Sequence, residues 1–256
     1  MDTQPHSLMH HIHDLRCFLW RSLWGVVACT LLCALLSHRL LTMLTYPLQS
    51  VLNSGDRLVV LSVYEYLFTQ LKVAILGGLL LATPWILYQL WQFIAPGLYR
   101  HEKRLCVAFT TASSLCALVG AVAGYFWGLP LVLSTLTGLL PPHIQGAYSL
   151  ESLFEFAAHT VLVCAALCET PVVVFALVAT RAVRVATLRQ YRRHVVVVAF
   201  ILGAVLTPPD PLTQILVAFP FVVLYEIGLL SARLLLPDVD ETNKLTKALF
   251  KNRGER

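Results

Sequence analysis

One glutamate stands among basic side chains in a chain that holds few charges. Residues 93–104 read FIAPGLYRHEKR, and Glu102 is flanked there by three Lys or Arg residues and a histidine. A carboxylate can receive an arginine guanidinium in a two-pronged pair, which gives direction as well as attraction. Two roles are therefore open for Glu102: a loop acid that balances its neighbours, or the counter-charge for a cationic ligand.

A second acid, Asp14, lies in the stretch HIHDLR at residues 11–16, just before the first long apolar run. An acid near a helix N-terminus is favoured by the helix dipole, which is the simpler interpretation. The alternative is that Asp14 and Glu102 lie at the same level of a membrane protein and form a site for a pair of arginines.

Three further polar residues lie in or beside apolar runs. Glu169 precedes Pro171 in the fourth run, and an acid at bilayer depth costs about 2.5–3.5 kcal/mol, so it must face protein or water or be protonated. Glu226 is either the acid at the end of a helix or a partner of Arg233, seven residues later. Gln214 either forms a hydrogen bond across helices or belongs to a polar outer turn.

The sequence shows no arrangement typical of catalysis or metal binding. It contains no G-x-S-x-G, no H-E-x-x-H and no phosphate-binding glycine loop. Its seven cysteines lack the partners of a zinc set and are expected as small buried hydrophobic residues. We therefore expect no enzyme activity, no cofactor and no metal.

The composition indicates what must position these residues. Of 256 residues 57% are hydrophobic and only 13% charged, against about a quarter charged in soluble domains, so the chain is an integral membrane protein. The predicted fold is all-α with six spans. They are Cys17–Ser37, Val73–Ala95, Leu105–Trp127 (ending near Pro130), Phe154–Thr180, Val195–Thr207 and Leu212–Leu236. Thirteen residues cover only about 20 Å, so the fifth helix is short, and Pro220 and Glu226 interrupt the sixth.

The distribution of Lys and Arg predicts the orientation. With the N-terminus inside, 16 of the 19 basic residues are cytoplasmic, and the outside holds only Arg39, Arg57 and Lys72. Both termini are therefore expected in the cytoplasm, and Glu102 in the first cytoplasmic loop. Residues 1–236 are expected to form the membrane domain and residues 237–256 a basic cytoplasmic tail. Within the fourth span, Glu155 and His159 are expected to form a local pair.

Several motifs, in order along nearly the whole chain, are similar to those of the TatC family, the multi-pass receptors of the twin-arginine protein translocase. They are HxxDLR at 11–16, Tyr46-Pro-Leu48, the run from Pro84 to Glu102, Gly124-Tyr-Phe126, Glu169-x-Pro171, Leu206-Thr-Pro-Pro-Asp210 with Gln214, and Tyr225-Glu-Ile-Gly228. The resemblance implies a glove-shaped protein of six helices with two short final helices, in the bacterial cytoplasmic (inner) membrane.

The resemblance also implies the function and the site. The protein would bind twin-arginine signal peptides of folded cargo. It would export that cargo with TatA- and TatB-type single-span partners and the proton-motive force, self-associating in the receptor complex and without nucleic acid. The residues implied in signal-peptide binding are Glu102, Asp14, Arg16, Arg104, Tyr99 and Leu98. Those implied as intramembrane polar, loop-shaping or partner-contact positions are Glu169, Gln214, Pro47, Phe93, Asp210 and Glu226. The family usually has Glu where this chain has Asp14, which shortens the reach of that carboxylate by one methylene.

Two other functions remain to be weighed. A secondary transporter would use Glu169 as its proton-coupled residue, but such proteins favour internal repeats, and the two halves of this chain are not alike. An intramembrane enzyme would need a nucleophile and a base, and the sequence offers no such set.

Overall fold

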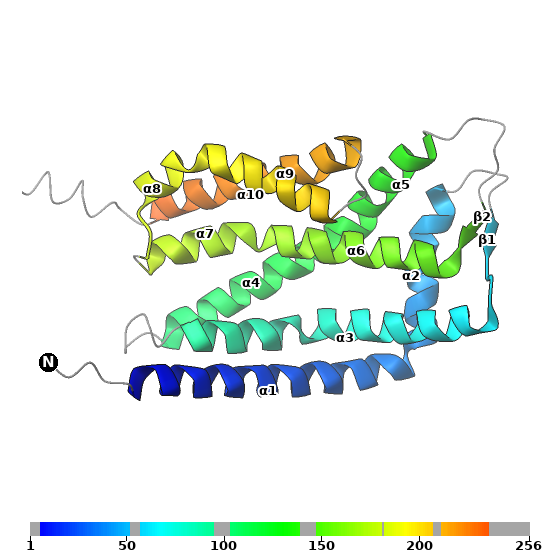
Figure 1. Ribbon diagram of the computed structural model, residues 1–256, viewed down its shortest axis with the longest axis horizontal. Coiled ribbons are helices and arrows are strands. Elements are labelled where there is room, and N and C mark those ends of the chain that lie inside the picture. Colours follow the sequence, from blue (N-terminus) through cyan, green and yellow to red (C-terminus); the bar gives the residue numbers. More distant parts are fainter. Residues whose placement is uncertain are drawn as a thin grey trace, which may run out of the picture. The chain divides into compact units, whose positions relative to one another are not determined.

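The computed structural model describes residues 6–51, 57–94, 103–138, 147–180, 182–206 and 211–235. Its helices, labelled in Figure 1, are α1 (His6–Leu35), α2 (Ser37–Val51), α3 (Val63–Ile94), α4 (Lys103–Ala123), α5 (Leu129–Gly138), α6 (Leu150–Cys168), α7 (Thr170–Ala179), α8 (Val185–Gln190), α9 (Arg192–Leu206) and α10 (Pro211–Leu235). A π-helical turn, η2 (Gly124–Gly128), joins α4 to α5, and two short strands are β1 (Arg57–Val59) and β2 (Ala147–Ser149). The all-α membrane fold expected from composition is confirmed.

Among the described residues, five helical segments are long and apolar enough to cross a membrane. They are Leu15–Leu35, Val63–Phe93, Val107–Thr135, Leu150–Ala179 and Gln214–Leu235. The fifth expected span corresponds to α9, which at 15 residues is short, as predicted. The last helix is different: α10 continues through Pro220 for 25 residues and has the length of a complete span, so only one of the two final helices is short.

The first expected outer loop contains regular structure. Residues 37–51 form α2, an amphipathic helix with the pattern SHRLLTMLTYPLQSV. The next span also begins earlier than predicted, at Val63 instead of Val73, so Lys72 lies inside α3 and not in a loop. Strand β1 pairs in parallel with β2, with Leu58 opposite Tyr148. This two-stranded ladder joins segments that are about 90 residues apart in the chain.

The third span does not end near Pro130. After α4 the backbone widens into η2, in which the Leu129 N–H donates to the Gly124 carbonyl, and then continues as α5. Proline has no N–H to donate, and it is tolerated in the first turn of a helix, where that donor would be unpaired anyway. The π-helical turn places Pro130 in such a first turn, and the helical path extends to Gly138.

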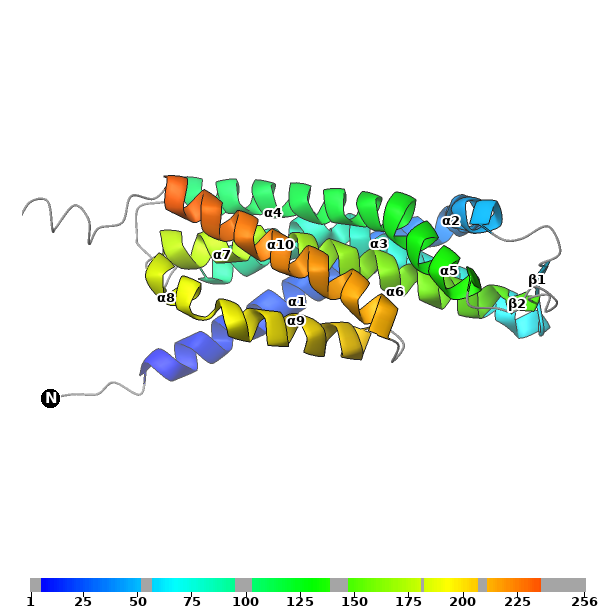
Figure 2. The ribbon, with the colours of Figure 1, turned by 90° about the horizontal axis from the view of Figure 1, so that it is seen from above.

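The chain divides into two compact units, residues 1–166 and 167–256. In the first, side chains of α2, α3 and α6 form one apolar cluster, which includes Leu41, Val73 and Phe154, and α5 and α6 form another around Leu129 and Ala157. In the second, Val174 of α7 packs with Tyr225 and Leu229 of α10. Both views show α9 beside α10 within this second unit (Figures 1 and 2).

Candidate functional site

The structure describes the helices that flank the predicted binding loop. Leu98, Tyr99, Glu102 and Asp210 lie outside the described residues. Asp14 lies within α1, Pro47 within α2 and Arg104 in the first turn of α4, but the described side chains do not include theirs. Arg16 is exposed on α1. The structure therefore describes the helices on both sides of the loop that carries Glu102.

The end of α3 is attached to α1 by an aromatic stack. The ring centroids of Phe18 and Phe93 are 5.8 Å apart, and the ring planes are inclined by 29° in a stacked arrangement. Phe93 is the second-last residue of α3. Phe18 lies one helical turn after Asp14 in α1, so positions 14 and 18 lie on the same side of that helix. The stack therefore brings the backbone that carries Asp14 to the end of α3 from which the Glu102 loop leaves.

A second aromatic contact attaches the same end of α3 to α4. The Trp91 indole N–H donates a hydrogen bond to Ser113 Oγ at 3.1 Å, and Ser113 is fully buried. The Trp91 ring also stacks on Phe109 with a centroid distance of 4.9 Å. A buried indole usually finds a partner for its N–H, and here the partner is on the helix that follows the loop. Both ends of the segment 95–102 are thus fixed by packed aromatic rings.

In the second unit, the polar residues singled out in the sequence have distinct surroundings. Glu169 lies at the junction of α6 and α7 and is partly buried, with its Oε1 atom excluded from solvent. Gln214 donates a hydrogen bond from Nε2 to the Phe200 carbonyl of α9 at 2.8 Å, so the cross-helix alternative is the observed one. Gly203 of α9 lies close to the same residue: a Cβ added at position 203 would be 3.1 Å from the Gln214 carbonyl oxygen.

Glu226 pairs with Arg192 at the start of α9, 2.5 Å away, and this is the ion pair that the structure records for it in place of the expected Arg233. Both side chains are more than 40% exposed. The neighbouring Tyr225 hydroxyl donates to the Leu188 carbonyl of α8 at 3.0 Å. Together these contacts attach the loop between α7 and α9 to the C-terminal half of α10.

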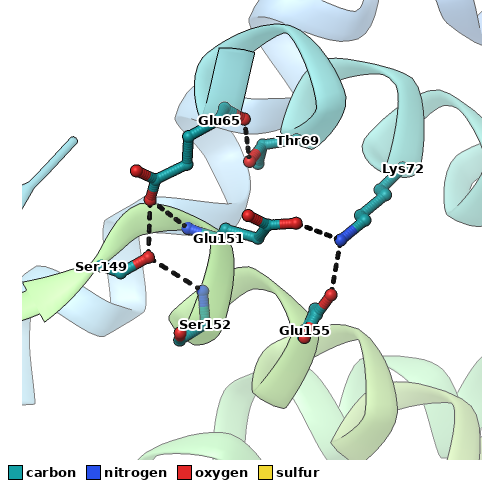
Figure 3. A network of polar contacts seen from close by, with 7 residues as sticks. All are labelled: Glu65, Thr69, Lys72, Ser149, Glu151, Ser152 and Glu155. Carbon is teal, nitrogen blue, oxygen red and sulfur yellow. Dashed lines mark hydrogen bonds and ion pairs between the residues drawn. The ribbon is translucent and has the colours of Figure 1, made fainter. Parts of the chain in front are cut away.

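A polar network in the first unit was not singled out in the sequence (Figure 3). The carboxylate of Glu65, which is 5% exposed, accepts hydrogen bonds from four donors in two separate segments. Oε2 accepts the backbone N–H groups of Leu61 and Ser62, at 2.5 and 3.3 Å, and Oε1 accepts the Ser149 hydroxyl at 2.6 Å and the Glu151 N–H at 3.0 Å. One side chain therefore caps the N-termini of both α3 and α6.

The same face of α3 carries Lys72, seven residues after Glu65. Its ammonium donates to Glu151 and, at 2.5 Å, to Glu155 of α6 (Figure 3). The expected local pair of Glu155 with His159 is therefore not the contact the structure records for Glu155. The spacing of these residues could have revealed part of the network. Glu151 and Glu155 share one face of a helix, so the two acids can together receive one cation such as Lys72. Hydropathy places the start of this span at Val73, so the ten preceding residues of α3 are predicted as a loop and the helical spacing of Glu65 and Lys72 is missed.

These features define a class of protein: a polytopic helical membrane protein whose chemistry lies in a few charged side chains at helix ends. Comparison with known proteins identifies the family, since the profile described as Sec-independent protein translocase protein (TatC) matches residues 10–220. The chain is 32% identical to the TatC protein of Haemophilus influenzae over 94% of this chain and 93% of that protein. It is 33% identical to TatC of Escherichia coli K12 over 91% and 89% of the two chains. It spans 63% of the length of another relative, TatC of Halothiobacillus neapolitanus, at 32% identity over 91% of this chain.

Solved structures give the same result. Two crystal structures described as the twin arginine translocase receptor TatC, one of them in DDM, match with TM-scores of 0.78 and 0.79 at 31% identity. They cover 88% and 87% of this chain and 98% and 99% of theirs. The chain belongs to the TatC family and is a membrane component of the Sec-independent protein translocase.

Proposed function

We propose that the protein is the receptor of a twin-arginine translocase. It binds signal peptides of folded cargo at the cytoplasmic end of α1, α3 and α4. Glu102 receives one arginine of the pair as a two-pronged ligand, and Asp14 provides a second negative charge. Arg16, Arg104, Leu98 and Tyr99 shape the surroundings of the two acids.

The observation that carries this proposal is the Phe18–Phe93 stack, 5.8 Å between centroids. It joins the helix of Asp14 to the helix that leads into the Glu102 loop, and the Trp91 contacts join that helix to α4. The helix that carries Asp14 and the two helices on either side of the Glu102 loop therefore pack together, and this supports a shared site for the two acids. The family relationship supports the same assignment, since the two matching crystal structures are described as a twin arginine translocase receptor.

The wider function follows from the family. We infer that the protein acts with TatA- and TatB-type single-span partners, which contact α9 and α10 and the polar positions Glu169, Gln214, Asp210 and Glu226. Pro47 and Phe93 shape the loops. Export is driven by the proton-motive force, the receptor self-associates, and the protein performs no catalysis. Both termini lie in the cytoplasm of a bacterium, the inner membrane holds residues 1–236, and residues 237–256 form a basic tail.

Site-specific photo-crosslinking tests the binding site. A photoreactive residue at position 101 is exposed to a peptide with Arg-Arg and to the same peptide with Lys-Lys. We expect a crosslink to Arg-Arg that is lost with Lys-Lys and in Glu102→Gln, which removes the charge but keeps the shape. Glu241→Gln, which removes an acid from the tail, is the matched control and should crosslink like the parent chain.

Equal crosslinking to both peptides would contradict the proposal and indicate a charged surface without specificity. Uptake of a small solute that depended on Glu169, with no peptide binding, would favour the secondary transporter instead. The deciding feature of that alternative is the acid in the membrane, and Glu169→Gln tests it separately.

A further inference from the structure

The seam between α1 and α3 is built from very close contacts. The two helices are antiparallel, so residues later in α1 contact residues earlier in α3. Phe18 contacts Phe93, Gly25 lies under the Trp85 ring, and Thr30 lies against Gly78. A Cβ added at Gly78 would be 2.5 Å from Thr30 Cα and 2.7 Å from its backbone nitrogen. The backbones of the two helices therefore approach each other closely at this point of the seam.

Trp85 makes a directional contact across this seam. Its indole N–H donates to the backbone carbonyl of Arg21 at 3.0 Å, across 64 residues of sequence. That carbonyl also lies one turn before Gly25 and can accept two hydrogen bonds, because it has two lone pairs. A side chain at Gly25 would collide with the indole ring, its Cβ lying 2.7 Å from Nε1. Glycine at this position is what allows the indole to lie on the helix backbone.

Packing and hydrogen bonding contribute differently to this seam. Apolar packing tolerates small slides along a helix, whereas a hydrogen bond to one carbonyl selects one register. The next carbonyl on the same face of α1 is one helical turn, about 5.4 Å, away. Losing the bond therefore leaves α1 packed on α3 but without the contact that fixes its axial position.

We propose that Trp85, seated on Gly25, is a positioning residue for signal-peptide recognition. It fixes the register of α1 against α3, and so the level of the Asp14 backbone relative to the last turn of α3, after which the chain continues to Glu102. This inference rests on the proposed receptor function. Two arginines that are adjacent in a peptide can engage two acids only when the acids are held at a matching spacing. Trp85 would therefore act on the preference for adjacent arginines while touching no peptide.

The test measures binding of labelled peptides to the full chain in lipid nanodiscs. The peptides carry Arg-Arg, Lys-Lys, or two arginines separated by one glycine. Trp85→Phe keeps an aromatic ring but removes the indole N–H donor, and Gly25→Ala displaces the Trp85 indole. We expect the preference for Arg-Arg over the spaced pair to fall about fivefold in Trp85→Phe, the equivalent of one net hydrogen bond of about 1 kcal/mol. Gly25→Ala should lower it at least as much.

Trp24→Phe is the matched control, because Trp24 lies on α1, next to Gly25, and is 66% exposed. It should keep the preference of the parent chain. A role in stability alone would lower the thermal midpoint of Trp85→Phe and leave the ratio of affinities unchanged, and that result would overturn the inference. Hydrogen exchange of α1 is measured alongside, and faster exchange of its N-terminal half is expected in Trp85→Phe.

The outcome for the parent chain separates this inference from the proposed function. If the parent prefers Arg-Arg and Trp85→Phe prefers it equally, only the positioning role is wrong. If the parent binds all three peptides equally, the receptor proposal is wrong. Separately, unchanged hydrogen exchange of α1 in Trp85→Phe would reject the claim that Trp85 fixes the register of α1 against α3.

Discussion

At the scale of single residues, Glu65 shows how one carboxylate can connect distant parts of a chain. Its two oxygens accept four hydrogen bonds, two from the backbone before α3 and two from the start of α6. Unpaired N–H groups at helix N-termini and the dipoles of both helices favour a negative charge at this point. The same segments carry the β1–β2 ladder, which is therefore closed by a side chain as well as by backbone pairing.

Glu65→Gln should destabilise the protein more than Glu155→Gln. The amide replaces one acceptor oxygen by a donor, so one pair of N–H or O–H donors loses its partner in a site that is 5% exposed. The side chain of Glu155, by contrast, is 59% exposed and shares Lys72 with Glu151. Water screens its interaction with Lys72, so removing its charge should cost little stability. Thermal unfolding in detergent, followed by the exposure of cysteines, would compare the two. Equal midpoints would show that the capping bonds of Glu65 are not important for stability.

The sequence identified the charged residues of the proposed site but not most of their contacts. Gln214 was expected to form a cross-helix bond as one of two alternatives, and it does so with the Phe200 carbonyl. Glu226 was matched with Arg233 because spacing on one helix is visible in a sequence, whereas its observed partner, Arg192, is on another helix. Pairings between helices depend on packing angles that periodicity does not contain.

At the scale of elements, glycines decide how closely helices can pack. Gly78 lies against the Thr30 backbone, Gly124 against Cys164, and Gly228 against Pro171, and in each case an added Cβ would lie within 3 Å of a neighbour. Small residues at such crossings are typical of membrane helices, which associate through close packing and not through the hydrophobic effect. These glycines were visible in the sequence, but their partners were not.

Gly78→Ala should separate α1 from α3 and lower stability by about 1–3 kcal/mol, the usual cost of overpacking. Its added Cβ meets backbone atoms, which cannot rotate away, at 2.5 and 2.7 Å. The matched control is Gly138→Ala, because nothing lies within 4 Å of a Cβ there, and alanine is the better helix former. Unfolding midpoints in detergent should fall for the first variant and stay level or rise for the second. A fall in both, or in neither, would contradict the packing argument.

Element boundaries were the least predictable part of the fold. Length and hydropathy located the five segments of the described chain that are long and apolar enough to span. The helix α3 nevertheless begins ten residues before its predicted start, because Glu65 provides a cap that hydropathy counts against a helix. The helix after Gly124 continues past Pro130, because the π-helical turn places proline where its missing N–H costs least. Both errors arose where polar or proline residues usually indicate a loop.

At the scale of the whole molecule, the described helices predict a topology that fusions can test. With both termini in the cytoplasm, as we propose, the segment after α5 is expected to lie outside the cytoplasm. Alkaline phosphatase, which is active only outside the cytoplasm, should be active when fused after Gln145 and inactive when fused after Arg256. A fluorescent protein that folds only inside should give the reverse pattern. Activity of both phosphatase fusions, or of neither, would reject the arrangement inferred from the basic residues.

Export by the assembled translocase brings the scales together. In cells that lack their own TatC, the parent chain is expected to export a folded fluorescent cargo with a twin-arginine signal. Glu102→Gln is expected to reduce this export at least tenfold, since a hydrogen bond to a charged group contributes about 1.5–3 kcal/mol. Asp14→Asn should have a smaller effect, because its carboxylate is one methylene shorter than the glutamate usual in the family. Asp14→Glu is then expected to equal or exceed the parent. If Asp14→Asn were the more damaging variant, the acid on α1 and not the loop acid would be the principal ligand, and the two assignments would have to be exchanged.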